Sequence, residues 1–114
     1  MSRNTPGLLP QVSFSVLLAL SLRPRHGYEL MQQIEEDSSG RLRLGPGALY
    51  GAIRLLDDEG LIEEVLPELP QERRRYYRLT LAGRKRLGAE LDYFASSMNL
   101  AKQRHILDTM RGSA

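Results

Sequence analysis

The sequence predicts a mainly α-helical domain with one small β-hairpin, followed by a long C-terminal helix. Two observations predict this class. Apolar residues recur at helical spacing in several segments before residue 60 and again over a long segment after residue 80. Between these regions, two short runs of β-favouring residues flank a loop that is bounded by prolines.

Composition and charge limit the function. The chain has 114 residues, the length of a single domain, and it has no cysteine, which excludes disulfides, thiol catalysis and a cysteine-based zinc site. The net charge is only +2, but arginines and a lysine gather between residues 71 and 86, whereas acidic residues cluster elsewhere. This separation indicates one face for a polyanion; the alternative is a solvated run of charges.

The apolar run of residues 16–20 resembles the core of a short signal peptide. Only Arg3 precedes it as a basic residue, no convincing cleavage site follows, and the run is far too short to span a bilayer. We therefore expect a cytoplasmic protein that makes no membrane contact.

A first helix is expected to start near Leu8 or Pro10, because proline is favourable in a first turn, and to end at Leu22. Residues 1–7 before it have the composition of an arm. The helix is apolar almost all round, which indicates burial on two sides. In a chain of this size one side would contact the core and the other a partner subunit.

The next segment predicts a turn at residues 23–27 and a second helix over residues 28–37. The helix ends at a Ser-Ser-Gly sequence, whose residues favour turns. Residues 41–44 then alternate polar and apolar side chains, which predicts a short strand.

A third helix is predicted from Gly45 or Pro46 to Glu59, with Gly60 supplying the left-handed residue that ends it. Its apolar face comprises Leu49, Ala52, Ile53 and Leu56. Its opposite face comprises Gly47, Tyr50, Gly51 and Arg54. The two glycines leave this face with little bulk, and the side chains of Tyr50 and Arg54 supply hydrogen-bond donors. A helix that is slim at its start fits a DNA major groove, about 12 Å wide. The alternative is an ordinary amphipathic helix.

The segment after Gly60 predicts a hairpin, with a strand over residues 61–66, a loop over residues 67–72 and a returning strand over residues 73–80. Arginines begin the returning strand. Tyr76 and Tyr77 should point to opposite faces of it, one toward the core and one toward the wing surface.

Thr80 is expected to cap a last helix that runs from Leu81 to about Met110. Apolar residues recur along it at alternating steps of four and three, which favours packing against another helix. They are Leu87, Leu91, Phe94, Met98 and Ala101. Such a helix outreaches a small domain, so a second subunit is the simplest cover for its apolar end.

Three helices followed by a two-stranded wing describe a winged helix-turn-helix, whose third helix enters the major groove. The arginines then lie where a wing meets DNA phosphates, which guanidinium groups bind well. We expect residues 1–80 to form this domain and residues 81–114 to form a dimerisation helix.

Several blocks of the chain, between about residues 12 and 90, resemble the PadR-type transcriptional regulators. The blocks at their mutual spacing are specific, above all the His-Gly-Tyr and the Tyr-Tyr-Arg-Leu-Thr sequences. They are Leu17–Leu20, His26–Leu30, Gly47–Tyr50, Arg54–Leu56, Glu59–Ile62 and Arg75–Thr80, with Gly83. The single C-terminal helix resembles the class with a short C-terminal region.

The resemblance implies a homodimeric repressor that binds a palindromic operator on double-stranded DNA and acts in the bacterial cytoplasm, on the nucleoid. It implies DNA contacts at Tyr28, Gly47, Ala48, Tyr50, Arg54, Arg73, Arg74 and Arg75. It also implies dimer contacts from the first and last helices. For these we expect Leu17, Leu87, Leu91, Phe94, Met98, Ala101 and Leu107.

The chain departs from the family pattern at two positions of the third helix and in its composition. Ala48 stands where many members have a hydroxyl, and Gly51 is small where bulkier residues are common. Relatives that bind planar drugs stack them on tryptophans at the dimer interface, and this chain has no tryptophan. The resemblance therefore leaves a small hydrophobic effector as an expectation without a named pocket.

Several single residues have two interpretations. His26 either fixes the turn before the second helix, or is a phosphate contact or a pH-sensitive switch. Tyr28 and Tyr50 either donate to phosphate or pack between helices. Arg54 either contacts a base edge or forms an ion pair with Asp57 or Asp58. His105 has no metal-ligand partner at a suitable spacing, so we expect a surface or interface residue.

No cofactor, metal site or catalytic residue is expected. The sequence has no phosphate-cradling loop with a following Lys-Ser or Lys-Thr, and no His-x-x-x-His pair. Two other functions remain as alternatives. One is a winged helix that docks protein partners, and the other is a dimer that binds small molecules without specific DNA recognition.

Overall fold

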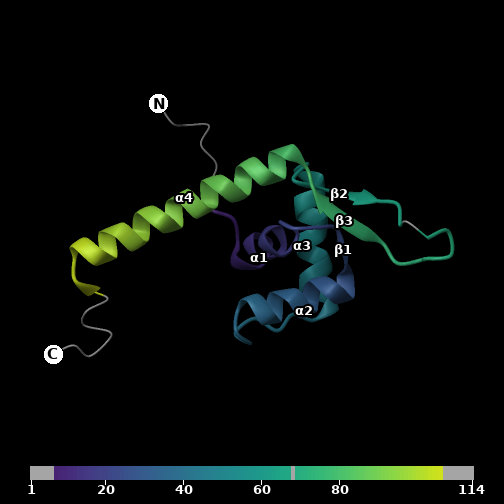
Figure 1. Cartoon of the computed structure of the whole chain (residues 1–114), viewed down its shortest axis with the longest axis horizontal. Coiled ribbons are helices and arrows are strands. Elements are labelled where there is room, and N and C mark those ends of the chain that lie inside the picture. Colours follow the sequence, from purple (N-terminus) through teal and green to yellow (C-terminus); the bar gives the residue numbers. More distant parts are fainter. Residues whose placement is uncertain (1–6, 68, 107–114) are drawn as a thin grey trace.

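The computed structural model describes residues 7–67 and 69–106. Three helices and a small sheet form a domain from which the last helix extends, in the direction opposite to the wing (Figure 1). The helices are α1 (Gln11–Ala19), α2 (Gly27–Asp37), α3 (Pro46–Asp58) and α4 (Leu81–Gln103). The strands are β1 (Arg25–His26), β2 (Ile62–Val65) and β3 (Tyr76–Leu79). The predicted fold class, mainly α with a small β-wing, is confirmed.

The antiparallel sheet has the strand order β1-β3-β2. Within it, Tyr76 lies opposite both His26 and Val65, and Tyr77 lies opposite Arg25 and Glu64. The two tyrosines do point to opposite faces, since Tyr77 is buried and Tyr76 is only half-buried.

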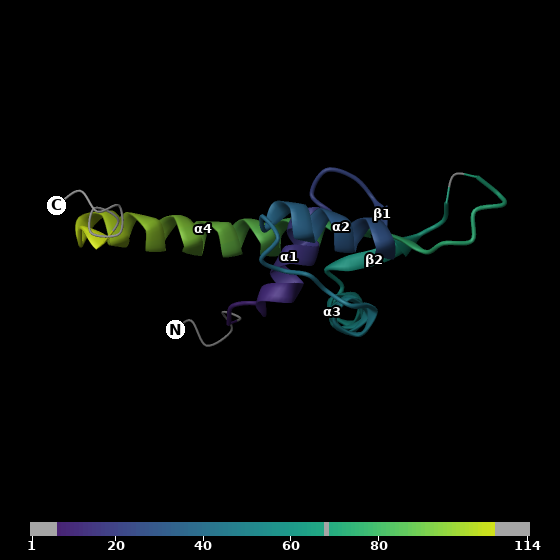
Figure 2. The same ribbon diagram turned by 90° about the horizontal axis from the view of Figure 1, so that it is seen from below.

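The hydrophobic core lies between α1, α2, α3 and the inner face of the sheet. The predicted apolar face of α3 is buried throughout, and so are Val16, Leu17 and Ala19 of α1. The buried apolar residues are Val16, Leu17, Ala19, Leu20, Leu30, Ile34, Leu49, Ala52, Ile53, Leu56, Leu61, Ile62, Tyr77, Leu79 and Leu87. Viewed from below, α3 lies on one side of this core, and its outer face is free (Figure 2).

The first helix is shorter than predicted, and the turn after it contains a strand that was not predicted. The helix ends at Ala19, not at Leu22, and Nε of the buried Arg25 donates to the carbonyl oxygen of Ala19 over 2.7 Å. Arg25 therefore satisfies one of the carbonyls that the end of a helix leaves without a partner. β1 has only two residues, too few to show an alternating pattern.

The strand predicted at residues 41–44 is wrong. This segment is irregular, and Leu42 and Leu44 pack against the core as the chain passes from α2 to α3. The amide of Leu42 donates to Oγ of Ser38 over 2.9 Å. The apolar alternation therefore reflects burial of two side chains and not pairing with another strand.

The ends of α3 and the start of α4 follow the prediction. Gly60 has φ +74°, and the amide of Leu61 donates to the carbonyl of Leu56, which closes α3 in the way a left-handed glycine allows. Oγ1 of Thr80 accepts from the amide of Gly83 over 3.0 Å and so caps α4. α4 ends at Gln103, before the predicted Met110, and Leu107 and Met110 lie outside the described residues.

Gly83 fixes how closely α4 approaches the sheet. A Cβ atom at this position would overlap the carbonyl oxygen of Leu61, which already accepts a hydrogen bond from the amide of Thr80. Backbone held in this way has little freedom to move. The start of α4 thus tolerates no side chain where it passes the end of α3.

We expect Gly83→Ala to destabilise the protein by about 2 kcal/mol, because the added methyl group overpacks a junction of two backbones. Gly88→Ala, in the same helix, is the matched control: nothing lies within 4 Å of a Cβ at that position. This second variant should gain up to about 1 kcal/mol from helix propensity. Urea unfolding at equal protein concentration measures both, and equal midpoints would contradict the expectation.

Candidate nucleic-acid interface

The outer face of α3 is open to solvent and bears little bulk. Pro46 occupies the first turn, Gly47, Ala48 and Gly51 are exposed, and a Cβ at either glycine would meet nothing within 4 Å. Arg54 is also exposed and makes no hydrogen bond or ion pair with another described residue. The alternative ion pair with Asp57 or Asp58 is therefore absent, and the guanidinium is available to a ligand.

Tyr50 lies on the same face but also joins two helices. Its ring and hydroxyl lie against Gly27 at the start of α2, where a Cβ atom would overlap them. Nearly half of the side chain remains exposed. Tyr50 thus packs between α2 and α3 while it presents one edge to solvent.

The start of α2 is capped by His26. Nδ1 of the ring accepts from the amide of Glu29 over 3.3 Å, and the carboxylate of Glu29 accepts from the amide of His26 over 3.1 Å. This reciprocal pair is a capping box. The ring is almost fully buried and contacts Tyr76 edge-on, with 5.2 Å between ring centroids. The interpretation of His26 as a helix-start residue is confirmed.

Tyr28 projects from the first turn of α2, and its side chain is 62% exposed. Its hydroxyl accepts a hydrogen bond from the Gln32 amide over 3.1 Å. A phenol that accepts can still donate its own proton. Tyr28 can therefore donate to a phosphate oxygen at the positive end of α2.

The three wing arginines lie before β3 and not within it, because β3 begins at Tyr76. Arg73 is exposed, and its side chain bonds to no other described residue. Nε of Arg75 lies 4.0 Å from the carboxylate of Glu64, and both side chains are more than half exposed. An exposed pair at this distance is weak and exchangeable with solvent ions.

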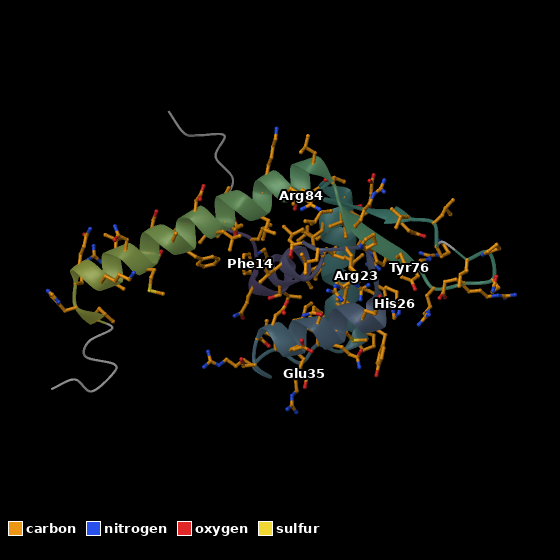
Figure 3. The ribbon with its side chains drawn as sticks, viewed as in Figure 1. Phe14, Arg23, His26, Glu35, Tyr76 and Arg84 are labelled. Carbon is orange, nitrogen blue, oxygen red and sulfur yellow. The ribbon has the colours of Figure 1, made fainter. Side chains whose placement is uncertain are left out.

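Arg74 differs from its two neighbours. Its Nε and Nη2 atoms both donate to the carboxylate of Glu72, over 2.9 and 2.6 Å. Its Nη1 atom lies 3.0 Å from Nε2 of His26. The side chains of Arg23, His26 and Tyr76 gather at this edge of the sheet (Figure 3). This part of the wing therefore lies beside the start of α2.

Two carboxylates of this region have lowered pKa values. Hydrogen bonds from Arg74 lower the pKa of Glu72 from 4.5 to about 2. For Glu29, burial raises the pKa, but hydrogen bonds from Arg23 and the His26 amide, together with the nearby positive charges, outweigh it. Both carboxylates therefore stay ionised at neutral pH and hold the arginines beside them.

The structure thus brings α3, the start of α2 and the wing together. Tyr50 of α3 lies against Gly27 of α2. Arg74 of the wing lies beside His26 at the start of α2. The sequence interpretation did not identify Arg23, Glu29 or Glu72 as members of this region. The local signals were present: His26 and Glu29 have the spacing of a capping box, and Glu72 stands two residues before Arg74. No group of three acidic, histidine or cysteine side chains that could hold a metal occurs among the described residues.

The expected dimer residues fall into two groups. Leu17 and Leu87 are buried within the protomer's own core, so they present no surface to a partner. Leu91, Phe94 and Met98 are each more than 40% exposed, and Ala101 is half-buried. Leu107 lies outside the described residues. No described helix is long and apolar enough to cross a membrane.

We expect the carboxyl of Glu72 to titrate near pH 2 and to return toward 4.5 in Arg74→Gln, because the arginine hydrogen bonds favour the ionised form. The pKa is lowered in the folded state. The contribution of this pair to stability is therefore present above the unfolded pKa and is lost as the pH falls through about 2. Carbon-detected NMR of the Glu72 carboxyl measures its pKa in wild type and in Arg74→Gln. Arg73→Gln is the control, and it should leave this pKa unchanged. An unshifted wild-type carboxyl would contradict the observed geometry.

Comparison with known proteins identifies the family. Residues 16–89 match the model of the "Transcriptional regulator PadR-like family". An uncharacterised 37.1 kDa protein in transposon Tn4556 of Streptomyces fradiae is 43% identical over 75 residues. The aligned region covers 66% of this chain and 20% of that protein, so the chain spans about a fifth of this relative's length.

Two solved structures are similar in fold. A PadR family transcription regulator from Clostridium difficile has a TM-score of 0.72 and 22% identity, with 82% of this chain and 97% of that chain covered. A PadR-like transcription factor from Bacteroides fragilis has a TM-score of 0.65 and 28% identity, with 83% and 88% covered. The resemblance noted in the sequence is thereby confirmed. The chain belongs to the transcriptional regulator PadR-like family.

Proposed function

We propose that the protein is a homodimeric repressor that binds a palindromic operator through α3 and the wing. Residues 1–80 read the DNA and residues 81–114 pair the subunits, in the cytoplasm and on the bacterial nucleoid. The observation that carries this proposal is the contrast between the two ends of the molecule. One end presents an open, donor-bearing α3 beside a basic wing, and the other presents a helix whose apolar side chains are about half exposed, although Phe94 contacts Phe14 of α1.

The apolar side chains of α4 support dimerisation. Beyond Glu90 the helix leaves the domain, and its large apolar residues are about half exposed. Those of the predicted stripe are Leu91, Phe94 and Met98. A continuous apolar stripe of this kind is typical of an interaction surface. In a two-fold dimer the same stripe meets its copy, so one surface covers both helices.

DNA recognition follows from the arrangement of the other end. Arg54, one turn after Tyr50, is the side chain on α3 best suited to a guanine edge, because its fork of donors matches the two acceptors of that base. Tyr28, Gly47, Ala48 and Tyr50 would contact the backbone around it. In a dimer, two α3 helices would reach major grooves about 34 Å apart, one turn of DNA, or a multiple of it. The bound dimer would then block polymerase.

The test is fluorescence anisotropy with a DNA fragment from upstream of the protein's own gene, at several salt concentrations and with competitor DNA. We expect binding that survives the competitor, with log K falling by about 0.9 per phosphate neutralised as log salt rises. Selection from a random DNA library separates a wrong fragment from a wrong function. A library that yields no preferred sequence would overturn the operator proposal.

We expect Arg54→Ala to lose about 1–3 kcal/mol of operator binding and to relax the preference at one base pair of each half-site, because a base contact is removed. Lys85→Ala is the control: it removes the same charge from an exposed position of α4. Anisotropy with operator and scrambled duplexes measures both. Equal losses on the two duplexes would mean that Arg54 contacts phosphate alone.

We expect Leu91→Glu with Met98→Glu to abolish dimerisation and to weaken operator binding, because both exposed side chains lie in the apolar stripe. The matched control is Ser96→Glu with Gln103→Glu, which adds the same two charges to exposed positions on the other side of α4. Light scattering after size-exclusion chromatography gives the mass. A dimer that persists in the first variant would move the interface elsewhere.

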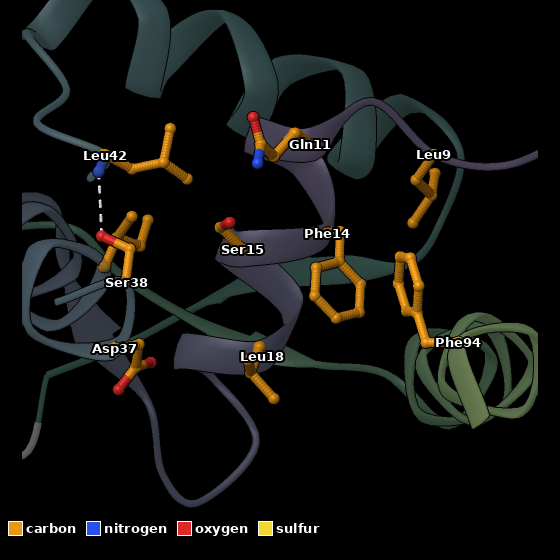
Figure 4. Close-up of a pocket in the computed structure, with 10 residues that line it drawn as sticks. Leu9, Gln11, Phe14, Ser15, Leu18, Asp37, Ser38, Leu42 and Phe94 are labelled. Atoms are coloured by element: carbon orange, nitrogen blue, oxygen red, sulfur yellow. Dashed lines mark hydrogen bonds between the residues drawn. The ribbon is translucent and has the colours of Figure 1, made fainter. Parts of the chain in front are cut away.

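A hydrophobic effector would fit between α1 and Phe94 of α4, beside the end of α2 and the segment that follows it. A pocket of about 420 Å³ opens there, lined by Leu9, Phe14, Leu18, Leu42 and Phe94 among others. Phe14 and Phe94 meet edge-on at one end of it, with 5.1 Å between ring centroids (Figure 4). An occupant would contact both helices and change the angle between them, and so the spacing of the two DNA-binding heads. An operator affinity unchanged by every hydrophobic compound tried would remove this part of the proposal.

A further inference from the structure

Arg25 is a buried positive charge that no carboxylate of the described chain neutralises. The residue is 8% exposed, and none of its nitrogens forms an ion pair within 4.0 Å with a described carboxylate. Buried arginines are normally paired, because the removal of a charge from water is costly. This side chain therefore has capacity for a further, negatively charged partner.

The contact between Arg25 and α1 uses one nitrogen of the guanidinium group. Nε donates to the carbonyl oxygen of Ala19 at the end of α1, where a positive charge is favourable. Nη1 and Nη2 make no hydrogen bond with another described residue, and neither is fully shielded from solvent. The fork of donors at the tip of the guanidinium group is thus available to a ligand.

Arg25 lines a pocket between the end of α1, the loop after it and one side of α2. The pocket has a volume of about 300 Å³, which is at the lower end of the range for small-molecule sites. The rest of its lining is Leu18, Ala19, Ser21, Leu22, Gln33 and Asp37. None of the residues expected to contact DNA is among them. The pocket therefore suits a small ligand that binds away from the DNA.

Asp37 gives the same pocket a negative charge. Its Oδ1 atom accepts a hydrogen bond from Nε2 of Gln33 over 2.8 Å, and its Oδ2 atom has no partner among the described residues. The carboxylate does not pair with Arg25, since their charged atoms are more than 4.0 Å apart. Two opposite charges that line one pocket without neutralising each other are complementary to a ligand that carries both charges. Leu18 and Leu22 add apolar surface to the lining.

We propose that this pocket binds an amino carboxylate, a small molecule with a carboxylate, an ammonium group and an apolar body. The carboxylate accepts from Nη1 and Nη2 of Arg25, whose planar fork matches two oxygens. The ammonium group donates to Asp37, and the apolar body lies on Leu18 and Leu22. The site is distinct from the hydrophobic pocket beside Phe94, with which it shares only Leu18 and Asp37 (Figure 4). Binding there requires neither DNA nor a second subunit.

Isothermal titration calorimetry of the full chain, without DNA, tests the class of ligand. The probes are L-leucine, γ-aminobutyrate and ε-aminocaproate, which hold their two charges at different separations. Each probe is compared with the matched acid, which lacks the amine, and with the matched amine, which lacks the carboxylate. We expect at least one amino carboxylate to bind about tenfold more tightly than both of its matched compounds, because each of these loses a charge-assisted hydrogen bond. No binding by any probe, or an acid that binds as tightly as its amino carboxylate, would overturn the proposal.

Two variants assign the two ends of the ligand. Asp37→Asn neutralises an exposed residue, so the fold is kept, and it should weaken only the compounds with an ammonium group, by about tenfold. Arg25→Lys keeps the positive charge, but a single nitrogen cannot form the planar fork, so this variant should weaken only the compounds with a carboxylate. Glu36→Gln is the matched control for charge, because Glu36 is exposed beside Asp37 and does not line the pocket. It should bind like wild type.

A purely structural role for Arg25 gives a different result. Arg25→Lys would then lower the Tm but leave the affinity of the amino carboxylate relative to its matched amine unchanged, and this outcome would overturn the proposal. Gln11→Ala is the control for location, because Gln11 lines the hydrophobic pocket and not this one. A loss of binding in Gln11→Ala as large as in Asp37→Asn would place the ligand in the other pocket. Since none of these measurements uses DNA, their failure and the failure of the operator proposal are distinguishable.

Discussion

The rest of the structure depends on the burial of α1 among the other helices. α1 packs against α2, α3 and α4, and Val16 and Leu17 have no solvent-exposed surface. The hydrophobic effect draws the apolar face of α3 onto this helix, and the polar face is turned outward as a result. The start of α4 is fixed at another point, where Gly83 lies against the carbonyl oxygen of Leu61. Because the core buries the apolar side of α3, the opposite side is left exposed as the recognition surface.

Charged contacts add orientation to this core. Arg23 binds Glu29, Glu29 completes the cap with His26, and Arg74 of the wing binds Glu72. Such pairs are partly exposed, so each contributes little to stability. Their value lies in geometry, because the first two order the loop after α1 and the start of α2, and the third orders the wing. A wing and a recognition helix that touch the same duplex must keep a constant relation to each other.

α4 belongs to two environments. Near its start, Leu87 lies in the core, and Oε1 of the buried Glu90 accepts from the amide of Leu9 over 3.0 Å. Arg86 binds both Glu90 and the carbonyl of Gly7, so the described N-terminal residues are tied to the helix. Beyond Glu90 the helix carries an apolar stripe that is about half exposed, and Phe94 within it contacts Phe14 of α1. Motion of this distal part relative to the core would therefore be transmitted through α1, which contacts the helix and the recognition element alike.

The sequence by itself determined the elements with a local signal: the amphipathic α2 and α3, the stop at Gly60, the cap at Thr80 and the alternation of Tyr76 and Tyr77. Each of these features depends on residues that are close in sequence, within one or two helical turns, or on the spacing of apolar residues alone. Tertiary structure decided the early end of α1, the two-residue β1, the irregular path of residues 41–44 and the partners of Arg74. Each of these depends on a contact between residues that the chain brings together only on folding. A run of three arginines looks uniform in sequence, and only the positions of His26 and Glu72 make the middle one different.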